Sequence, residues 1–282
     1  MPEYCRFDFQ TRKLGLREPV IRLYPIVCMH VGSQQCDEKF IKEYLRRCLE
    51  DPNGRLLYLG DGGDCVVEGS KGSLFEQVLN PQQQMDVLVE WFTPLAKKDK
   101  LLLGIRGNHG HRVFKLTGLE FDKNLCHRLG IPYMGVATFC NLIVNRSSYD
   151  LYFHHGADSG TALRAKIAKA ENFARYIDAD AIFTAHSHIA ADLQPAPLLL
   201  CDNANASTKV KNRHQYICGS GYDGRTGYGE DRGYPPILPS YIVVEFDGAI
   251  VSGHARYRQS CEVIRSDGQH EISHPYIFRE IK

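Results

Sequence analysis

Long apolar runs are absent from this chain of 282 residues. Nowhere do about 18 consecutive apolar residues occur, and residues 1–8 contain no apolar segment, so the sequence predicts neither a membrane span nor a signal peptide. We therefore expect a cytoplasmic protein with no membrane partner. The formal net charge of +1 provides no overall attraction to nucleic acid, so only a local patch could bind such a partner.

Closely spaced cysteine pairs are also missing. The ten cysteines are scattered from Cys5 to Cys261 without a Cys-x-x-Cys pair, which argues against a zinc ribbon and a compact disulfide framework. We expect most of them to be small buried side chains, with Cys28 as the exception.

Repeats, linkers and low-complexity tracts are absent too. We therefore expect one domain over 1–282, in which 20–190 carries the motifs and 191–282 supplies further strands and a long loop.

The most informative stretch is an apolar run that leads directly into polar residues. Leu101–Ile105 has no alternation, which is typical of a strand buried on both faces, and Gly107, Asn108 and His109 follow it. Open α/β sheets place their ligands at the carboxyl ends of their strands. By itself this turn is also ordinary Gly-Asn turn chemistry.

The pattern of strand, polar turn and helix recurs along the chain and predicts an α/β fold. Helical spacing of apolar residues and capping signals predict helices from Asp37 to about Glu50, from Pro81 to about Lys98, over Leu116–Leu129 and over 161–176. Strands are predicted at 20–29 (with Pro25 favouring an edge or bulge), 56–59, 101–105, 131–135, 138–144, 149–154, 179–184, 190–193, 198–201, 215–219, 240–246 and 249–257, and one long loop at 220–239.

Metal-ligand side chains follow five of these strands. They are Cys28 and His30, Asp61 and Asp64, Asn108 and His109, His155, and the pair His186 and His188. Imidazoles, carboxylates and an amide oxygen that converge from several strand ends are suitable ligands for a metal ion. A single His-x-His on a strand, or an Asp in a glycine-rich turn, is often only polar, so the five together carry the interpretation.

In these five blocks the sequence resembles the calcineurin-like metallophosphoesterase superfamily. The family pattern is Asp-x-His, Gly-Asp-x-x-Asp/Asn, Gly-Asn-His-Asp/Glu, His-Gly and Gly-His-x-His, and the blocks occur here in that order between residues 26 and 188. Segments 30–33, 69–73 and 233–236 look most like the phage and prophage branch. The resemblance implies a four-layer α/β/β/α sandwich and a hydrolytic centre with two divalent metal ions.

The resemblance also implies roles for individual residues. The first metal would be bound by Cys28, His30, Asp61 and His188, and the second by the bridging Asp61 with Asn108, His155 and His186. Two divalent ions of Mn, Fe or Zn would hold the phosphoryl oxygens and activate a water molecule. His109 would stabilise the transition state or protonate the leaving oxygen.

Three residues depart from the family pattern. Cys28 replaces an aspartate, Gly110 replaces the acidic residue after Asn108 and His109, and Ala185 replaces a glycine. As a thiolate, Cys28 would keep the negative charge and shift the metal preference towards Zn²⁺ or Fe. The alternative is a buried thiol beside a weak or empty first site. Without a carboxylate at residue 110, we expect His109 to be held less firmly, unless His111 or Asp64 compensates.

Basic and aromatic residues suggest a polyanionic substrate. Arg106 and Arg112 flank the central turn, a basic run occupies 209–214 in a predicted loop, and Tyr222 begins the long loop. These residues favour a phosphodiester of nucleotide or nucleic-acid type, although such runs are often only solvated surface.

Two alternatives stay open: a binding or scaffold protein inactivated by the changes at Cys28 and Gly110, and a nuclease acting on polymeric DNA or RNA. The oligomeric state has no sequence signal.

Overall fold

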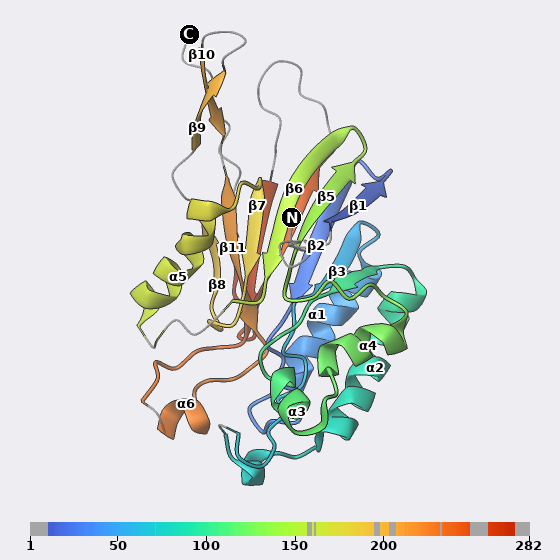
Figure 1. Cartoon of the computed structure of the whole chain (residues 1–282), viewed down its shortest axis with the longest axis vertical. Helices are drawn as coiled ribbons and strands as arrows, with labels where there is room; N and C mark the ends of the chain where they lie inside the picture. Colours follow the sequence, from blue (N-terminus) through green and yellow to red (C-terminus); the bar gives the residue numbers. More distant parts are fainter. Residues whose placement is uncertain are drawn as a thin grey trace, which may run out of the picture.

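The computed structural model describes residues 11–70, 72–156, 160, 162–194, 198–202, 207–211, 213–231, 233–248 and 259–273 (Figure 1). Its strands are β1 (Thr11–Leu16), β2 (Val20–Ile26), β3 (Gly54–Tyr58), β4 (Leu101–Gly104), β5 (Ala137–Val144), β6 (Ser147–His154), β7 (Ala181–Thr184), β8 (Ala190–Leu193), β9 (Leu198–Asp202), β10 (Ser207–Lys211), β11 (His214–Ser220), β12 (Ser240–Asp247), β13 (Gln259–Arg265) and β14 (His270–Ser273). Its helices are α1 (Glu38–Glu50), α2 (Pro81–Lys97), α3 (Gly110–Thr117), α4 (Phe121–Leu129), α5 (Leu163–Tyr176) and α6 (Tyr228–Asp231).

Among the described strands, 12 are joined by hydrogen bonds, nine of them along one continuous path, and together they form two sheets. One sheet has the order β1-β5-β6-β7-β11, with β8 beside β11, and the other has the order β12-β2-β3-β4, with β13 and β14 beside β12. The two sheets join where Gly219 and Ser220 of β11 pair with Tyr241 and Ser240 of β12. Strands β2, β3 and β4 are parallel to one another, and so are β6, β7 and β11. Within each set, the carboxyl ends of the strands therefore lie on the same side of the sheet.

The two sheets pack face to face between helices. The buried ring of Tyr149 on β6 lies 4.9 Å from that of Phe246 on β12, centroid to centroid, and one apolar cluster includes residues of both sheets. Helices α1, α2 and α4 contact the sheet that contains β3 and β4, whereas α5 contacts β7 and β11 of the other (Figure 1). The α/β class and the four-layer α/β/β/α order expected from the sequence are therefore confirmed.

The first two helices begin at the caps that the sequence predicts. The side chain of Asp37 accepts a hydrogen bond from the backbone N–H of Phe40 at the start of α1. At the start of α2, Asn80 and Gln83 form a reciprocal capping box, with Pro81 in the first turn. These contacts satisfy N–H groups that have no partner within the helix.

The predicted helix over Leu116–Leu129 is confirmed only from Phe121 onward, as α4. The structure has two helices there, because Gly118 adopts a left-handed conformation with φ of 74° and ends α3. Glycine adopts this conformation at little cost and commonly ends helices. The break brings the N-terminus of α4 back towards the turn at residues 107–109.

Several strand predictions also need correction. Residues 131–135 form no strand, only one bridge between Tyr133 and Gly104, and the long loop 220–239 contains the short helix α6. Of the basic run predicted in a loop, Lys209 and Lys211 lie in β10, and His214 begins β11. Strands β1, β10 and β14 were not expected, because they are short and partly polar. The strand predicted at 249–257 lies outside the described residues.

The prediction of an edge or bulge position at Pro25 is wrong as well. Strand β2 lies between β12 and β3, and Pro25 itself is opposite Leu57. Proline is tolerated because the pairing of β2 with β12 extends from Val20 to Leu23 only, so the missing N–H breaks no bond of that ladder. No helix among the described residues is long and apolar enough to cross a membrane.

Candidate metal centre

The five blocks of ligand-type residues meet at the carboxyl ends of β2, β3, β4, β6 and β7. Backbone hydrogen bonds hold the segments after these strands together: the N–H of Cys28 donates to the carbonyl of Gly60 over 3.1 Å, and the N–H of Ala185 donates to that of His155 over 3.1 Å. Nδ1 of His155 lies 2.7 Å from the carbonyl oxygen of Leu59. Hydrogen bonds between the segments therefore hold the ligand-type residues of both sheets together.

The backbone at this place is strained. Eight non-glycine residues in the described part of the chain have positive φ, and five of them are predicted metal ligands: Cys28, His30, Asp61, His186 and His188. Each such conformation costs about 1–3 kcal/mol and usually persists where function requires it. The strain turns these side chains towards one another instead of leaving them to alternate across a strand.

The first cluster contains Cys28, His30 and His188, whose ligand atoms lie within 4.8 Å of one another. Nε2 of His30 is 3.1 Å from Nε2 of His188. Two nitrogens bound to one tetrahedral Zn²⁺ at about 2.05 Å would be about 3.3 Å apart, so this separation suits a shared ion. Cys28 is fully buried, and His30 is 2% exposed.

The second cluster contains Cys28, Asp61 and His155. Nε2 of His155 lies 2.8 Å from Oδ2 of Asp61 and 3.0 Å from Oδ1 of Asn108, again the spacing of neighbouring ligands on one ion. Oδ2 of Asp61 is buried and makes no hydrogen bond of suitable geometry with any described residue. A buried carboxylate oxygen left in this way is costly, and a divalent cation would satisfy it. The residues present therefore fit a metal centre.

The arrangement of the two clusters differs from the implied ligand sets in one respect. Cys28 belongs to both clusters, whereas the resemblance implies that Asp61 is the shared residue. His186 stands beside the second cluster, with its ring 5.5 Å from that of His155. The structure thus brings all seven predicted ligand residues to one place, and which of them bridges two ions stays a prediction.

A third group consists of His30, Asp64 and His109, in which Asp64 contacts both imidazoles. Oδ1 of Asp64 lies 3.0 Å from Nδ1 of His30 and 3.1 Å from Nδ1 of His109, while Oδ2 accepts a hydrogen bond from Gln77 over 2.6 Å. Burial raises the pKa of Asp64, but hydrogen bonds from the two imidazoles outweigh it and lower that pKa. An ionised Asp64 keeps the proton of His30 on Nδ1 and leaves Nε2 free to bind a metal ion.

Burial and neighbouring charges set the protonation of the ligands. Burial and the neighbouring His109 lower the pKa of His30. Burial and the neighbouring His30 lower the pKa of His188, so both imidazoles stay neutral. Burial and the charge of Asp61 raise the pKa of the Cys28 thiol, and a backbone hydrogen bond from His186 partly opposes them. The pKa of Asp61 is held well below its usual value by His155, His109 and His30, despite its burial.

His109 lies next to this centre with both ring nitrogens engaged. Nδ1 lies 2.9 Å from the carbonyl oxygen of Asp64, and Nε2 lies 3.2 Å from Nη2 of Arg112. A carbonyl can only accept and a guanidinium can only donate, so the proton is on Nδ1 and Nε2 accepts from Arg112. The backbone N–H of His109 donates to Oδ1 of Asp61 over 2.7 Å.

Asp122 on α4 occupies the place that a side chain at residue 110 would need. A Cβ built on Gly110 would lie 3.0 Å from Oδ2 of Asp122. That oxygen accepts from the N–H of Gly107 over 3.1 Å, and Oδ1 accepts from the hydroxyl of Tyr58. Burial raises the pKa of Asp122 to about 6. No motif in the sequence pointed to Asp122, because the break at Gly118 brings it to the turn.

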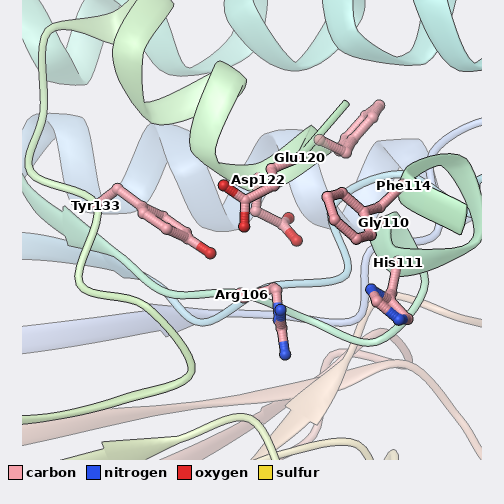
Figure 2. A pocket seen from close by; sticks show the side chains of 8 residues that line it. Arg106, Gly110, His111, Phe114, Glu120, Asp122 and Tyr133 are labelled. Atoms are coloured by element: carbon pink, nitrogen blue, oxygen red, sulfur yellow. The ribbon is translucent and has the colours of Figure 1, made fainter. Parts of the chain in front are cut away.

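The predicted substrate-binding residues lie on different sides of the centre. Arg112 contacts His109, and the ring of Tyr222 lies 5.3 Å from that of His30 and 5.6 Å from that of His188. The hydroxyl of Ser220 holds the start of this loop by donating to the carbonyl of Cys28 over 2.8 Å. Arg106 instead lines a separate hollow beside Gly110 and Asp122 (Figure 2).

The chain matches no protein-family model and no curated protein. Its structural neighbours are Vps29 proteins and metallophosphoesterases, at low similarity. A single mutant of Vps29 from Entamoeba histolytica has 12% identity and a TM-score of 0.46, with 90% of this chain and 97% of that chain covered. Vps29 from Cryptosporidium parvum has 12% identity and a TM-score of 0.46, with 91% and 97% covered. A metallophosphoesterase from Sphaerobacter thermophilus has 12% identity and a TM-score of 0.38, with 92% and 89% covered.

Proposed function

We propose that the chain is a metal-dependent phosphoesterase with a two-metal centre. The supporting observation is the pair of clusters that meet at Cys28, where imidazole nitrogens and carboxylate and amide oxygens lie 2.8–3.1 Å apart. Cys28, His30 and His188 would hold one ion, and Asn108, His155 and His186 would hold the other. Asp61 would bridge the two ions. When bound, two divalent ions would polarise the phosphoryl oxygens and activate a water molecule for in-line attack.

The chain's own residues would orient the ester and stabilise its transition state. Arg112 donates towards Nε2 of His109, so a phosphoryl oxygen that displaces this contact would meet a guanidinium and an imidazole together. Asp61 fixes the backbone of His109 and thereby its distance from the centre. With its proton on Nδ1, His109 would accept a proton at Nε2 before it could protonate a leaving oxygen.

The donor set favours Zn²⁺ or Fe for the site of Cys28, because a thiolate is a soft ligand. Burial opposes ionisation of this thiol, so a bound cation would have to stabilise the thiolate. We place the enzyme in the cytoplasm, and no disulfide joins the cysteines of the described residues, which suits a reducing compartment. A phage origin and a preference for phosphodiesters belong to the proposal as well.

Hydrolysis of bis-p-nitrophenyl phosphate beside the p-nitrophenyl monoester tests this function. The protein is assayed in reducing buffer with Mn²⁺, Zn²⁺ or Fe²⁺ added in turn, and the Asp61→Ala variant is the blank. We expect metal-dependent turnover that disappears in the blank, with the diester as the better substrate. Absence of turnover with every metal would favour the alternative, a binding or scaffold protein that keeps the fold.

A further inference from the structure

A glutamine without exposed surface, Gln84, lies near the start of α2. The other buried residues of this helix are all apolar: Met85, Leu88, Phe92 and Leu95. Glutamine is mostly an exposed residue, and its burial is costly unless its donors and acceptor are hydrogen-bonded. The groups that Gln84 contacts should therefore explain why an amide is buried here.

Two backbone groups fix the orientation of the Gln84 amide. Its Oε1 accepts a hydrogen bond from the backbone N–H of Cys65 over 2.9 Å, and its Nε2 donates to the carbonyl oxygen of Leu79 over 2.8 Å. A backbone N–H can only donate, and a carbonyl can only accept. Turning the amide over would place two donors against each other at Cys65 and two acceptors at Leu79, so only one orientation satisfies both groups.

The same amide sets the direction of the hydrogen bonds that reach Asp64. Nε2 of Gln84 also donates to Oε1 of Gln77 over 3.0 Å, and Nε2 of Gln77 donates to Oδ2 of Asp64 over 2.6 Å. Since Gln77 must present its oxygen to Gln84, only its NH₂ group is left for Asp64. Oδ2 of Asp64 is thus an acceptor, and its other oxygen, Oδ1, lies 3.0 Å from Nδ1 of His30.

The backbone leaves space for this chain of amides. Gly32 follows His30 by two residues and has φ of 96°, and a Cβ built on it would lie 2.4 Å from Nε2 of Gln84. A Cβ on Gly63 would lie 2.8 Å from Oε1 of Gln84. The segment that carries Gln77 is bound to the same turn, because the N–H of Val78 donates to the carbonyl of Gly32 over 2.8 Å. Side chains at residues 32 and 63 would displace the Gln84 amide, so both glycines preserve its contacts.

We propose that Gln77 and Gln84 are positioning residues for the first metal ion. In every bond from the N–H of Cys65 to Asp64, the donor lies on the Cys65 side, so the two amides orient the carboxylate of Asp64 as an acceptor. Asp64 in turn keeps the proton of His30 on Nδ1 and leaves Nε2 free for the ion. This inference rests on the proposed function for the metal centre and adds two residues outside the five ligand blocks.

The variant Gln77→Met tests this role, since methionine has a similar length and can donate no hydrogen bond to Asp64. Gln82→Met is the matched control, because Gln82 is an exposed glutamine of α2 that donates to the exposed Asp86 over 3.0 Å. We expect Gln77→Met to weaken Zn²⁺ binding about tenfold in competition with a chelator, and Gln82→Met to leave it unchanged. Equal affinities of wild type and Gln77→Met would overturn the assignment.

A double-mutant cycle separates positioning from a merely structural role. If Gln77 acts through Asp64, Gln77→Met should have little further effect on Zn²⁺ affinity once Asp64→Asn is present. Loss of the fold's stability alone would instead make the two effects add. We therefore expect the double variant to bind Zn²⁺ within about twofold of Asp64→Asn, and a further tenfold loss would contradict the proposal.

The tautomer of His30 in the metal-free wild type tests the direction of the chain without disturbing it. The protein is labelled with ¹⁵N-histidine, and long-range ¹H–¹⁵N correlations show which ring nitrogen carries the proton, with His30→Asn assigning the signals. We expect the proton on Nδ1, and a proton on Nε2 would overturn the proposal.

These readouts are independent of ester hydrolysis. Zn²⁺ binding that depends on Gln77, without any hydrolysis, would contradict the proposed phosphoesterase and support the positioning role. Hydrolysis by a protein whose Zn²⁺ affinity is insensitive to Gln77→Met would contradict the positioning role alone.

Discussion

Nε2 of His30 and Nε2 of His188 face each other across 3.1 Å, although the two residues are 158 positions apart in the chain. Both imidazoles are kept neutral by burial, which lowers their pKa values. The proton of His30 is held on Nδ1 by Asp64, so its Nε2 presents a lone pair to the space between the rings. Two imidazole nitrogens at this separation would supply two of the four ligands of a tetrahedral metal ion.

Cys28 should determine which metal the first site prefers. We expect Cys28→Asp to shift preference from Zn²⁺ towards Mn²⁺, because a carboxylate oxygen is a harder ligand than a thiolate. The measurement is metal content after equilibration with equal concentrations of the two ions, followed by the rate of diester hydrolysis. Unchanged metal content and an unchanged rate would show that Cys28 does not shape this site.

Asp64 should support the centre without binding the metal. We expect Asp64→Asn to weaken metal binding or activity by about 10- to 100-fold, since ligand orientation by such partners is typically worth that much. Competition with a chelator measures the metal affinity. Asp86→Asn is the control, because Asp86 is largely exposed on α2 and bonds to Arg128. Equal affinities in wild type and Asp64→Asn would contradict the role assigned to Asp64.

Arg112 should contribute to the chemical step. We expect Arg112→Met to reduce kcat about 100-fold, because removal of one donor to a developing negative charge commonly costs that much. Lys115→Met on the exposed side of α3 changes the same charge and should leave kcat within about twofold. If both variants lost activity equally, net charge rather than the contact with His109 would be responsible.

Asp122 should make the stability of the protein depend on pH. Its pKa is raised to about 6 by burial, whereas an exposed aspartate has a pKa near about 4. The protonated form therefore favours the folded state at low pH, and this contribution is lost as the pH rises from about 4 through about 6. We expect Asp122→Asn to remove that part of the slope. Denaturant unfolding of both metal-free proteins at several pH values measures it, and identical slopes would contradict the assignment.

The sequence predicted the elements whose signals are local. The apolar run before Asp61 and the capping box of Asn80 and Gln83 specify β3 and α2 without reference to the rest of the fold. The five ligand blocks could be found because each follows a strand. That Asp64 would hold His109 in place of a carboxylate at residue 110 was one of the alternatives that the sequence left open.

Contacts that depend on packing could not be predicted. Asp122 reaches the N–H of Gly107 only because Gly118 breaks the helix and turns α4 back towards the sheet. The hollow lined by Arg106 and Tyr133 arises from the same break. The left-handed backbone at the ligands is equally invisible in the sequence, since only a few per cent of non-glycine residues adopt it, although aspartate and histidine do so more often than most.

Metal stoichiometry tests the central claim most directly. Purified wild type, His188→Ala and Asp61→Ala are equilibrated with Zn²⁺, freed of unbound ions and analysed by inductively coupled plasma mass spectrometry, with His127→Ala as a control for an exposed histidine on α4. We predict two ions per chain in wild type and in the control, one in His188→Ala, and fewer than two in Asp61→Ala. A wild-type protein without bound metal, or equal stoichiometry in all four proteins, would contradict the two-metal centre.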